Sequence, residues 1–380
     1  MSLKQGHITF AIHQFGEGGM QRSVSTLCSG LQSRGWNVSV IVGARGSKDK
    51  LGLFSSVATT NLMGGIFPLT VLSFLKFFRS GSVCDYLIVQ NSAMMAGALC
   101  AKWLIRSRAP LVLYFRNPLT RDMELERSPF AGLYHGLTRF FIRRFMGEAN
   151  ALFFNSQGTR QSLEAFVGTH RLPAFVLNNP VIRSDFEQRA EQPVKDFCKQ
   201  PGEKLLVGMG RLHYQKNFAL LIRAHAILRK TMPVRTLILG EGPERGRLEA
   251  LIRELGLQDE VQLIGYRQNP LPYLAQADVF VLSSSFEGFG NVIVEALALG
   301  VNVVATDCPG GPAEILENGK YGSLAKVDDE QDLAVKIHQR LVHPLPKALL
   351  KDRADEFNED TVLDRFSHTV MHLLSSGPAS

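Results

Sequence analysis

Short runs of β-branched and aromatic residues alternate with helical patterns along this chain, and this alternation constrains the fold more than any other feature. Strands that are separated by helices form parallel sheets whose faces the helices cover. The expected strands fall into two sets, at 7–12, 38–42, 86–89, 111–115, 151–154 and 175–177, and at 205–209, 236–239, 261–264, 279–282 and 303–305. The sequence therefore predicts an α/β protein with two doubly wound parallel sheets.

Composition and periodicity divide the chain further. With 380 residues it has room for two domains, at roughly 150 residues per domain. The segment 186–203 is polar, contains Pro193 and Pro201, and is predicted to link a first domain, 1–185, to a second domain, 204–355. Apolar residues recur at helical spacing within 356–380, so we expect a terminal helix there that either stays beside the second domain or crosses back to the first.

The composition is that of a globular protein without a membrane span. No stretch reaches the roughly 18 apolar residues that a span needs, and the nearest, 66–78, contains Pro68 and Lys76. The first residues lack the apolar core of a secretory signal, and the five cysteines form no C-x-x-C pair. Free, buried thiols in a cytoplasmic protein are therefore expected.

Positive charge is concentrated in the first half of the chain. Residues 1–190 hold 21 Lys and Arg against 10 Asp and Glu, a net charge of +11, whereas residues 191–380 hold 21 against 25, a net charge of −4. In the basic half, the segments 74–79, 102–108 and 137–146 mix cations with large apolar residues. Such segments suit an anionic membrane surface, here the inner face of the cytoplasmic membrane, and equally suit core helices with solvated outer faces. No nucleic-acid-binding motif is visible, so nucleic acid is not an expected partner.

Two glutamates, Glu287 and Glu295, flank the start of an expected helix that follows the strand 279–282. A helix N-terminus leaves backbone N–H groups unpaired and suits a diphosphate, and Gly288 and Gly290 allow the backbone to approach a ligand closely. Carboxylates beside such a site can accept hydrogen bonds from sugar hydroxyls. The alternative is an ordinary helix entry with an incidental glutamate inside the helix.

Two cations, Arg211 and Lys216, follow the strand 205–209 directly. At a strand's carboxyl end they can hold a diphosphate from two sides, the arginine as a planar fork and the lysine as a point charge. A solvated basic loop is the alternative. Glycine turns follow the next strands, at 240–242, 265–268 and 309–311. In the second of these a base could lie against Tyr266 and the plane of Arg267, or the turn could simply end a strand.

These loops together resemble the retaining glycosyltransferases of the GT-B fold, in the large fourth family that builds bacterial surface glycans. The resemblance rests on the Arg211/Lys216 loop, on the E-x7-E motif of Glu287 and Glu295, and on the turn 307–312. Looser matches lie at 16–19, after the first strand, and at 178–180. It implies two Rossmann-like domains facing across a cleft, the first binding an acceptor and the second a nucleotide sugar.

The resemblance also implies roles for single residues. Arg211 and Lys216 would neutralise the donor diphosphate and stabilise the departing nucleotide. Glu295 would hold the ribose hydroxyls, and Glu287 would contact the donor sugar. The remaining donor-side positions would be the backbone N–H groups of Phe289, Gly290 and Asn291, the loop glycines Gly18 and Gly19, and Tyr266 and Arg267.

On the acceptor side the chain departs from the family. Many relatives place a histidine after the strand equivalent to 111–115, whereas this chain has Arg116 and Asn117 there. Either residue would position the acceptor or the sugar, and His13 would contact the sugar or serve the structure alone. No D-x-D motif flanked by an apolar strand is present, so we expect no metal and no other cofactor.

The expected activity follows from this resemblance. It is the metal-independent transfer of a hexose or N-acetylhexosamine from a nucleotide sugar, for which a UDP-sugar is expected. The anomeric configuration would be retained through front-face attack. The expected acceptor is a lipid-linked glycan, lipopolysaccharide or another surface polysaccharide. The alternatives are a nucleotide-sugar-binding subunit without activity of its own and a small-molecule glycoside synthase of the same fold.

Overall fold

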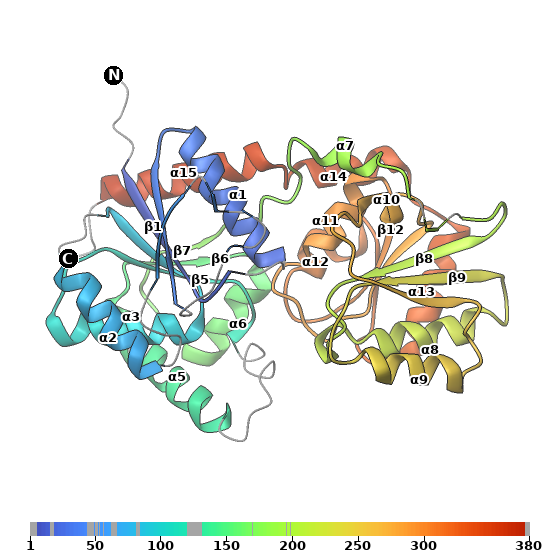
Figure 1. Cartoon of the computed structure of the whole chain (residues 1–380), viewed down its shortest axis with the longest axis horizontal. Coiled ribbons are helices and arrows are strands. Elements are labelled where there is room, and N and C mark those ends of the chain that lie inside the picture. Colours follow the sequence, from blue (N-terminus) through green and yellow to red (C-terminus); the bar gives the residue numbers. More distant parts are fainter. Residues whose placement is uncertain are drawn as a thin grey trace. The chain divides into compact units, whose positions relative to one another are not determined.

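The computed structural model describes residues 6–15, 19–43, 49, 52, 54–55, 57–61, 67–80, 84–119, 131–168, 170–194, 196–197 and 199–376. The chain forms two compact units (Figure 1). The first unit combines Met1–Pro180 with Glu359–Ser380, and the second is the continuous segment Val181–Asn358. The last stretch of the chain thus belongs to the first unit.

The first unit contains a seven-stranded sheet of order β3-β2-β1-β4-β5-β6-β7, in which all neighbours are parallel. Its strands are β1 (His7–Ile12), β2 (Asn37–Val42), β3 (Ala58–Asn61), β4 (Tyr86–Val89), β5 (Leu111–Phe115), β6 (Ala151–Phe154) and β7 (Ala174–Val176). The six strands expected from the sequence are confirmed, each within one residue at either end. The edge strand β3 was not predicted.

Helices cover both faces of this sheet (Figure 1). They are α1 (Gly19–Ser33), α2 (Phe67–Arg79), α3 (Ser92–Ile105), α5 (Ala131–Phe145), η2 (Met146–Glu148), α6 (Gln157–Val167) and α15 (Glu359–Ser376). α1 and α15 contact each other on one face, where Leu363 and Phe366 of α15 join the core formed with Phe10. On the other face α3 contacts both α2 and α5. The predicted terminal helix is therefore part of the first unit's core.

The second unit contains a six-stranded parallel sheet of order β10-β9-β8-β11-β12-β13. Its strands are β8 (Lys204–Met209), β9 (Val234–Leu239), β10 (Val261–Gly265), β11 (Val279–Leu282), β12 (Asn302–Thr306) and β13 (Ser323–Ala325). Five strands were expected at these places, and the short edge strand β13 was not. The two Rossmann-like sheets confirm the predicted fold class.

The helices of the second unit also form two layers. They are α7 (Phe186–Ala190), η3 (Tyr214–Lys216), α8 (Phe218–Leu228), α9 (Arg245–Glu254), α10 (Leu271–Leu274), α11 (Asn291–Ala298), α12 (Pro312–Ile315), η4 (Glu317–Gly319), α13 (Glu330–Val342) and α14 (Lys347–Asp355). α8, α9 and α13 pack on one apolar core of this unit, and α11, α12 and α14 pack on the other.

The segment 186–203 lies within the second unit instead of between two domains. Val194 and Phe197 pack against the core beneath α11, and the side-chain amide of Asn269 donates to the carbonyl oxygen of Arg189 over 2.7 Å. The polar composition of 186–203 predicted a linker. The few residues that anchor this segment have no regular spacing, so no pattern in the sequence indicated their packing.

Four cysteines, Cys28, Cys84, Cys100 and Cys308, are free thiols, three of them buried. Cys198 lies outside the described residues. Among the helices that the structure describes, none combines the length and the hydropathy needed to cross a bilayer.

Candidate functional site

The carboxyl ends of β8 and β11 mark the point where the strand order of the second sheet reverses. From β8 the chain continues to β9 and β10 on one side, and β11 to β13 extend on the other side. In open α/β sheets, ligands bind at such a reversal, outside the carboxyl ends of the strands. The loops that follow β8 and β11 carry the two cations and the first glutamate predicted from the sequence.

Lys216 and Glu287 form an ion pair at this point. The Lys216 Nζ donates to Glu287 Oε1 over 2.6 Å, although the two residues are 71 positions apart in the chain. The Ser284 hydroxyl donates to the same carboxylate oxygen over 2.5 Å. Because Glu287 is only 5% exposed, these two donors hold its carboxylate in one place. The structure thus brings together two of the predicted catalytic residues.

Hydrogen bonds join the two loops along their backbones. The side-chain amide of Gln215 donates to the carbonyl oxygen of Phe286 over 2.9 Å, and the Ser285 N–H donates to the Gln215 carbonyl over 2.8 Å. The Ser283 hydroxyl donates to the Lys216 carbonyl over 2.8 Å. The position of Lys216 is therefore set by its backbone as well as by its ion pair.

A third loop, the one that follows β12, holds the backbone of Glu287. The Glu287 N–H donates to the Pro309 carbonyl over 2.9 Å, in the glycine turn that follows β12. Gly310 has φ +129°, and a Cβ atom there would overlap the carbonyl oxygen of Glu287. Only glycine allows this close approach of two backbones.

Arg211 has a different environment from Lys216. Its side chain is exposed, and it makes no hydrogen bond or ion pair with any residue that the structure describes. Its loop is fixed by the turn after β9, because a Cβ atom at Gly240 would overlap the Gly210 carbonyl and the Leu212 N–H donates to the Glu241 carbonyl over 2.9 Å. Arg211 is thus a solvent-facing cation on a rigid support.

The second glutamate lies on α11, which begins at Asn291. Gly290 caps the helix with φ +104°, and Phe289 is buried with its ring 5.4 Å from the ring of Phe357. Glu295 lies half-buried in the second turn. The E-x7-E motif therefore places one carboxylate before the helix and the other within it, as the sequence predicts.

The turn after β10 holds the predicted base-contact residues. The Arg267 guanidinium pairs with the Asp196 carboxylate over 2.5 Å and donates to the Tyr273 hydroxyl over 3.0 Å. The Tyr273 and Asp196 interactions raise the pKa of Arg267 above its usual value. Tyr266 is exposed beside it. The guanidinium is thus fixed within the second unit.

The acceptor-side residues lie in the first unit. Arg116 is buried beyond β5, and its Nη2 donates to the Asn179 side-chain oxygen over 2.6 Å. Burial lowers the pKa of Arg116. Asn117 and His13 are half-buried. Gly19 begins α1, whereas Gly18 lies outside the described residues.

Two residues near Glu287 were not singled out from the sequence. Ser284 bonds its carboxylate, and only the serine run at 283–285 hinted at this. Cys308 is buried behind the turn, where burial, reinforced by the charge of Glu287, raises the pKa of its thiol to about 12. That thiol is protonated at neutral pH and is not a nucleophile.

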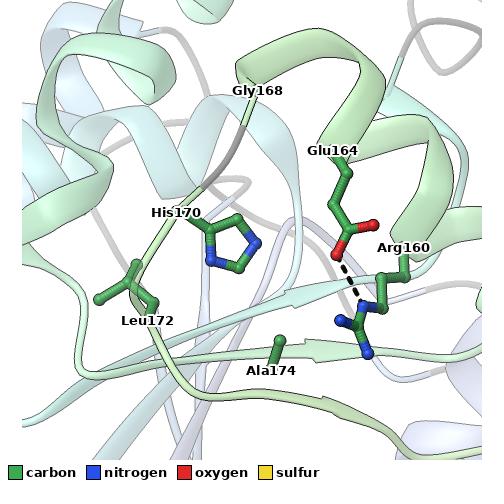
Figure 2. Close-up of a pocket in the computed structure, with 6 residues that line it drawn as sticks. All are labelled: Arg160, Glu164, Gly168, His170, Leu172 and Ala174. Carbon is green, nitrogen blue, oxygen red and sulfur yellow. Dashed lines mark hydrogen bonds and ion pairs between the residues drawn. The ribbon is translucent and has the colours of Figure 1, made fainter.

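A separate hollow of about 510 Å³ lies in the first unit and is shown in Figure 2. The residues that line it are Arg160, Glu164, Gly168, His170, Leu172 and Ala174. The Arg160–Glu164 ion pair of α6 forms one wall, at 2.8 Å. Because β7 begins at Ala174, the hollow lies at the amino ends of the strands, and it contains none of the predicted site residues.

Family models match both halves of the chain. The model described as Glycosyltransferase Family 4 matches residues 17–184, and the model described as Glycosyl transferases group 1 matches residues 190–355. The chain belongs to the GT-B glycosyltransferases of family four. This confirms the resemblance that the Arg211/Lys216 loop and the E-x7-E motif indicated.

Two curated relatives of this glycosyltransferase family member are bacterial enzymes. The chain is 33% identical over 227 residues to the N-acetylgalactosamine-N,N'-diacetylbacillosaminyl-diphospho-undecaprenol 4-alpha-N-acetylgalactosaminyltransferase of Campylobacter jejuni, covering 59% of this chain and 60% of that protein. It is 32% identical over 218 residues to the lipopolysaccharide core biosynthesis glycosyltransferase LpsE of Rhizobium meliloti, covering 56% and 57% respectively. The chain therefore spans less than two thirds of the length of these relatives.

Solved structures share the whole fold of this family member. Anabaena HepE, in complex with UDP, superposes with a TM-score of 0.73 at 21% identity and covers 96% of this chain and 100% of that one. At this identity the likeness shows the fold alone, which is the GT-B fold.

Proposed function

We propose that this protein is a retaining, metal-independent glycosyltransferase that moves a hexose or N-acetylhexosamine from a UDP-sugar to a lipid-linked glycan, a lipopolysaccharide or another surface polysaccharide. The observation that carries the proposal is the Lys216–Glu287 ion pair of 2.6 Å at the strand-order reversal of the second sheet, with Arg211 exposed on the same loop. This arrangement offers fixed positive charge where a diphosphate would lie.

The chemistry needs such charge. As the bond between the sugar carbon C1 and the diphosphate oxygen breaks, its electron pair leaves with the nucleotide and negative charge grows on the diphosphate. Lys216 stabilises that charge without reorganising, because its loop and its ion pair already hold it, and the exposed Arg211 adds a second positive charge from the same loop. Glu287 holds Lys216 and contacts the sugar, and Glu295 holds the ribose. The acceptor oxygen bonds to C1 on the same face, and its proton passes to the departing phosphate oxygen.

Relatives support the acceptor class. The Campylobacter jejuni relative is named for a diphospho-undecaprenol-linked substrate and the Rhizobium meliloti relative for the lipopolysaccharide core. Anabaena HepE was solved with UDP, which supports the choice of donor nucleotide. The first unit would supply the acceptor-side residues, among them His13, Arg116 and Asn117.

Binding and transfer can be tested in sequence. UDP at about one hundred times its dissociation constant is expected to stabilise the protein by about 2.7 kcal/mol, seen as a rise in melting temperature, whereas CMP is not. A panel of UDP-sugars is then incubated with an undecaprenyl-diphosphate-linked sugar, and the product mass and anomeric configuration are measured. Binding without any transfer or donor hydrolysis would favour the non-catalytic subunit, and an inverted anomer would reject retention.

We further propose that the first unit docks on an anionic membrane through α2, α3 and α5. These adjacent helices contain no Asp or Glu, and they carry six exposed large apolar residues: Leu69, Leu72, Trp103, Leu104, Leu137 and Phe140. Leu72 is 57% exposed and Phe140 60% exposed, and Arg143 and Arg144 are exposed beside them. Apolar groups that enter the headgroup region beside cations are typical of peripheral membrane proteins.

Liposome flotation tests this surface. The double substitution Arg143→Glu and Arg144→Glu is expected to weaken partitioning onto phosphatidylglycerol vesicles by roughly 30-fold or more, at about 1 kcal/mol per cation. Raising the salt from 0.1 to 1 M is expected to weaken it as well, because screening shortens the reach of these charges. The matched control is Arg223→Glu with Lys230→Glu, an exposed cation of α8 and one of the turn that follows it. Equal flotation of both double variants would reject this surface.

A further inference from the structure

Three strand ends in the first unit carry buried polar atoms that have no hydrogen-bond partner among the described residues. They are Nδ1 of His13 after β1, both side-chain amide atoms of Gln90 after β4, and Nη1 of Arg116 after β5. Gln90 and Arg116 are each 5% exposed. Buried polar groups in folded proteins are almost always paired, so several unpaired ones at neighbouring positions call for an explanation.

These strand ends lie side by side where the order of the first sheet reverses, between β1 and β4. Val89 pairs with Ala11 on one side and with Leu113 on the other, so Gln90 follows level with Tyr114. The Arg116 guanidinium lies over the Tyr114 ring, 4.9 Å from its centroid. Gln90 and Arg116 therefore lie at adjacent strand ends, at the place where an open α/β sheet binds ligands.

Among the residues that the structure describes, no opposite charge lies beside the guanidinium. The side-chain groups that act on Arg116 are the Asn179 amide oxygen, the Tyr114 ring and the Cys28 thiol, and no carboxylate among the described residues pairs with it. The thiol is itself neutral, because burial raises its pKa far above the usual value. A buried cation without a counter-charge destabilises the fold, so its presence is best explained by a ligand that supplies the charge.

We propose that Arg116, Gln90 and His13 bind an anionic group, a phosphate or a carboxylate, of the acceptor substrate. This inference rests on the proposed function and narrows it, because the acceptor class then carries a negative charge close to the hydroxyl that receives the sugar. The planar fork of arginine matches the paired oxygens of either group, and the Gln90 amide N–H adds a neutral donor. His13 is half-buried and follows β1, the strand next to β4.

The first test uses small anions in a background that removes the proposed donor site. In a Lys216→Ala variant, methyl phosphate or D-glucuronate at constant ionic strength is expected to raise the melting temperature. The shift should vanish when Arg116→Met is added and persist when Arg171→Met, an exposed arginine of the same unit, is added instead. The anion that gives the larger shift identifies the group. No shift with either anion, or equal shifts in both double variants, would overturn the proposal. Buried water molecules would then be the partners of the unpaired atoms.

The second test separates binding from structure. Without a ligand, Arg116→Met is expected to melt at or above the wild-type temperature, because it removes a buried charge. In transfer assays it should raise the KM for a charged acceptor by at least tenfold and leave UDP binding unchanged. A lower melting temperature without ligand would show that Arg116 is structural and would reject this inference. If the wild-type protein did not bind UDP, the proposed function would be rejected, whereas the anion site would be judged by the first test.

Discussion

Replacing Lys216 with methionine is expected to lower the transfer rate by about 10³-fold while the protein stays folded. Of the two cations on the loop after β8, Lys216 is the one that the structure holds in place, through its ion pair with Glu287 and through the Ser283 bond to its carbonyl. Methionine keeps most of the side-chain volume and removes the charge that stabilises the leaving diphosphate. Single-turnover kinetics with a UDP-sugar measure the effect on the chemical step. Lys230→Met, which changes an exposed lysine in the turn after α8, should retain full activity.

A double variant separates the catalytic role from the structural one. In Lys216→Met the buried Glu287 carboxylate keeps only its bond from Ser284, and the free energy of unfolding should fall by about 1–3 kcal/mol. Adding Glu287→Gln removes the unpaired charge, so stability in urea should return while activity does not. If transfer returned together with stability, Lys216 would be only a structural partner of Glu287. Because the two side chains touch, their effects are not expected to add.

Replacing Gly310 with alanine is expected to destabilise the second unit by about 3 kcal/mol or more. The added Cβ atom would overlap the Glu287 carbonyl, and φ +129° is strained for any residue with a side chain. Two backbones must then move apart, which displaces the Glu287 carboxylate and should abolish UDP binding. Urea unfolding and UDP titration measure the two effects.

Gly246 provides a matched control for this substitution. It lies inside α9, and a Cβ atom there would meet nothing within 4 Å. Gly246→Ala should therefore stabilise the protein by about 1 kcal/mol, through helix propensity alone. Equal stability of the Gly310 and Gly246 variants would contradict the close packing of the turn against Glu287.

The strands could be predicted from the sequence because buried parallel strands are continuous apolar runs. β1, β4 and β11 have the predicted limits. Two edge strands, β3 and β13, were missed for a physical reason. β3 reads Ala-Thr-Thr-Asn and β13 has three residues, and a strand that pairs on one side needs neither apolar character nor length.

The site was predictable only in part. Residue type and spacing after a strand pointed to Lys216, Arg211 and Glu287, because loops at the carboxyl ends of strands converge. The 2.6 Å ion pair between Lys216 and Glu287 depends on the tertiary structure, so no local sequence pattern predicts it. Gln90 was missed entirely, since a single glutamine after a strand carries no signal until the neighbouring strand ends are known.

The placement of α15 has a consequence for biosynthesis. Leu363 and Phe366, which follow the whole second unit in the sequence, complete the core that begins at Ile8 and Phe10, whereas the second unit is one uninterrupted segment. On the ribosome the second unit can thus finish folding while the first still lacks its closing helix. Nascent chains would carry an uncovered apolar face around Phe10 until α15 has been synthesised, and chaperones bind such exposed apolar surfaces.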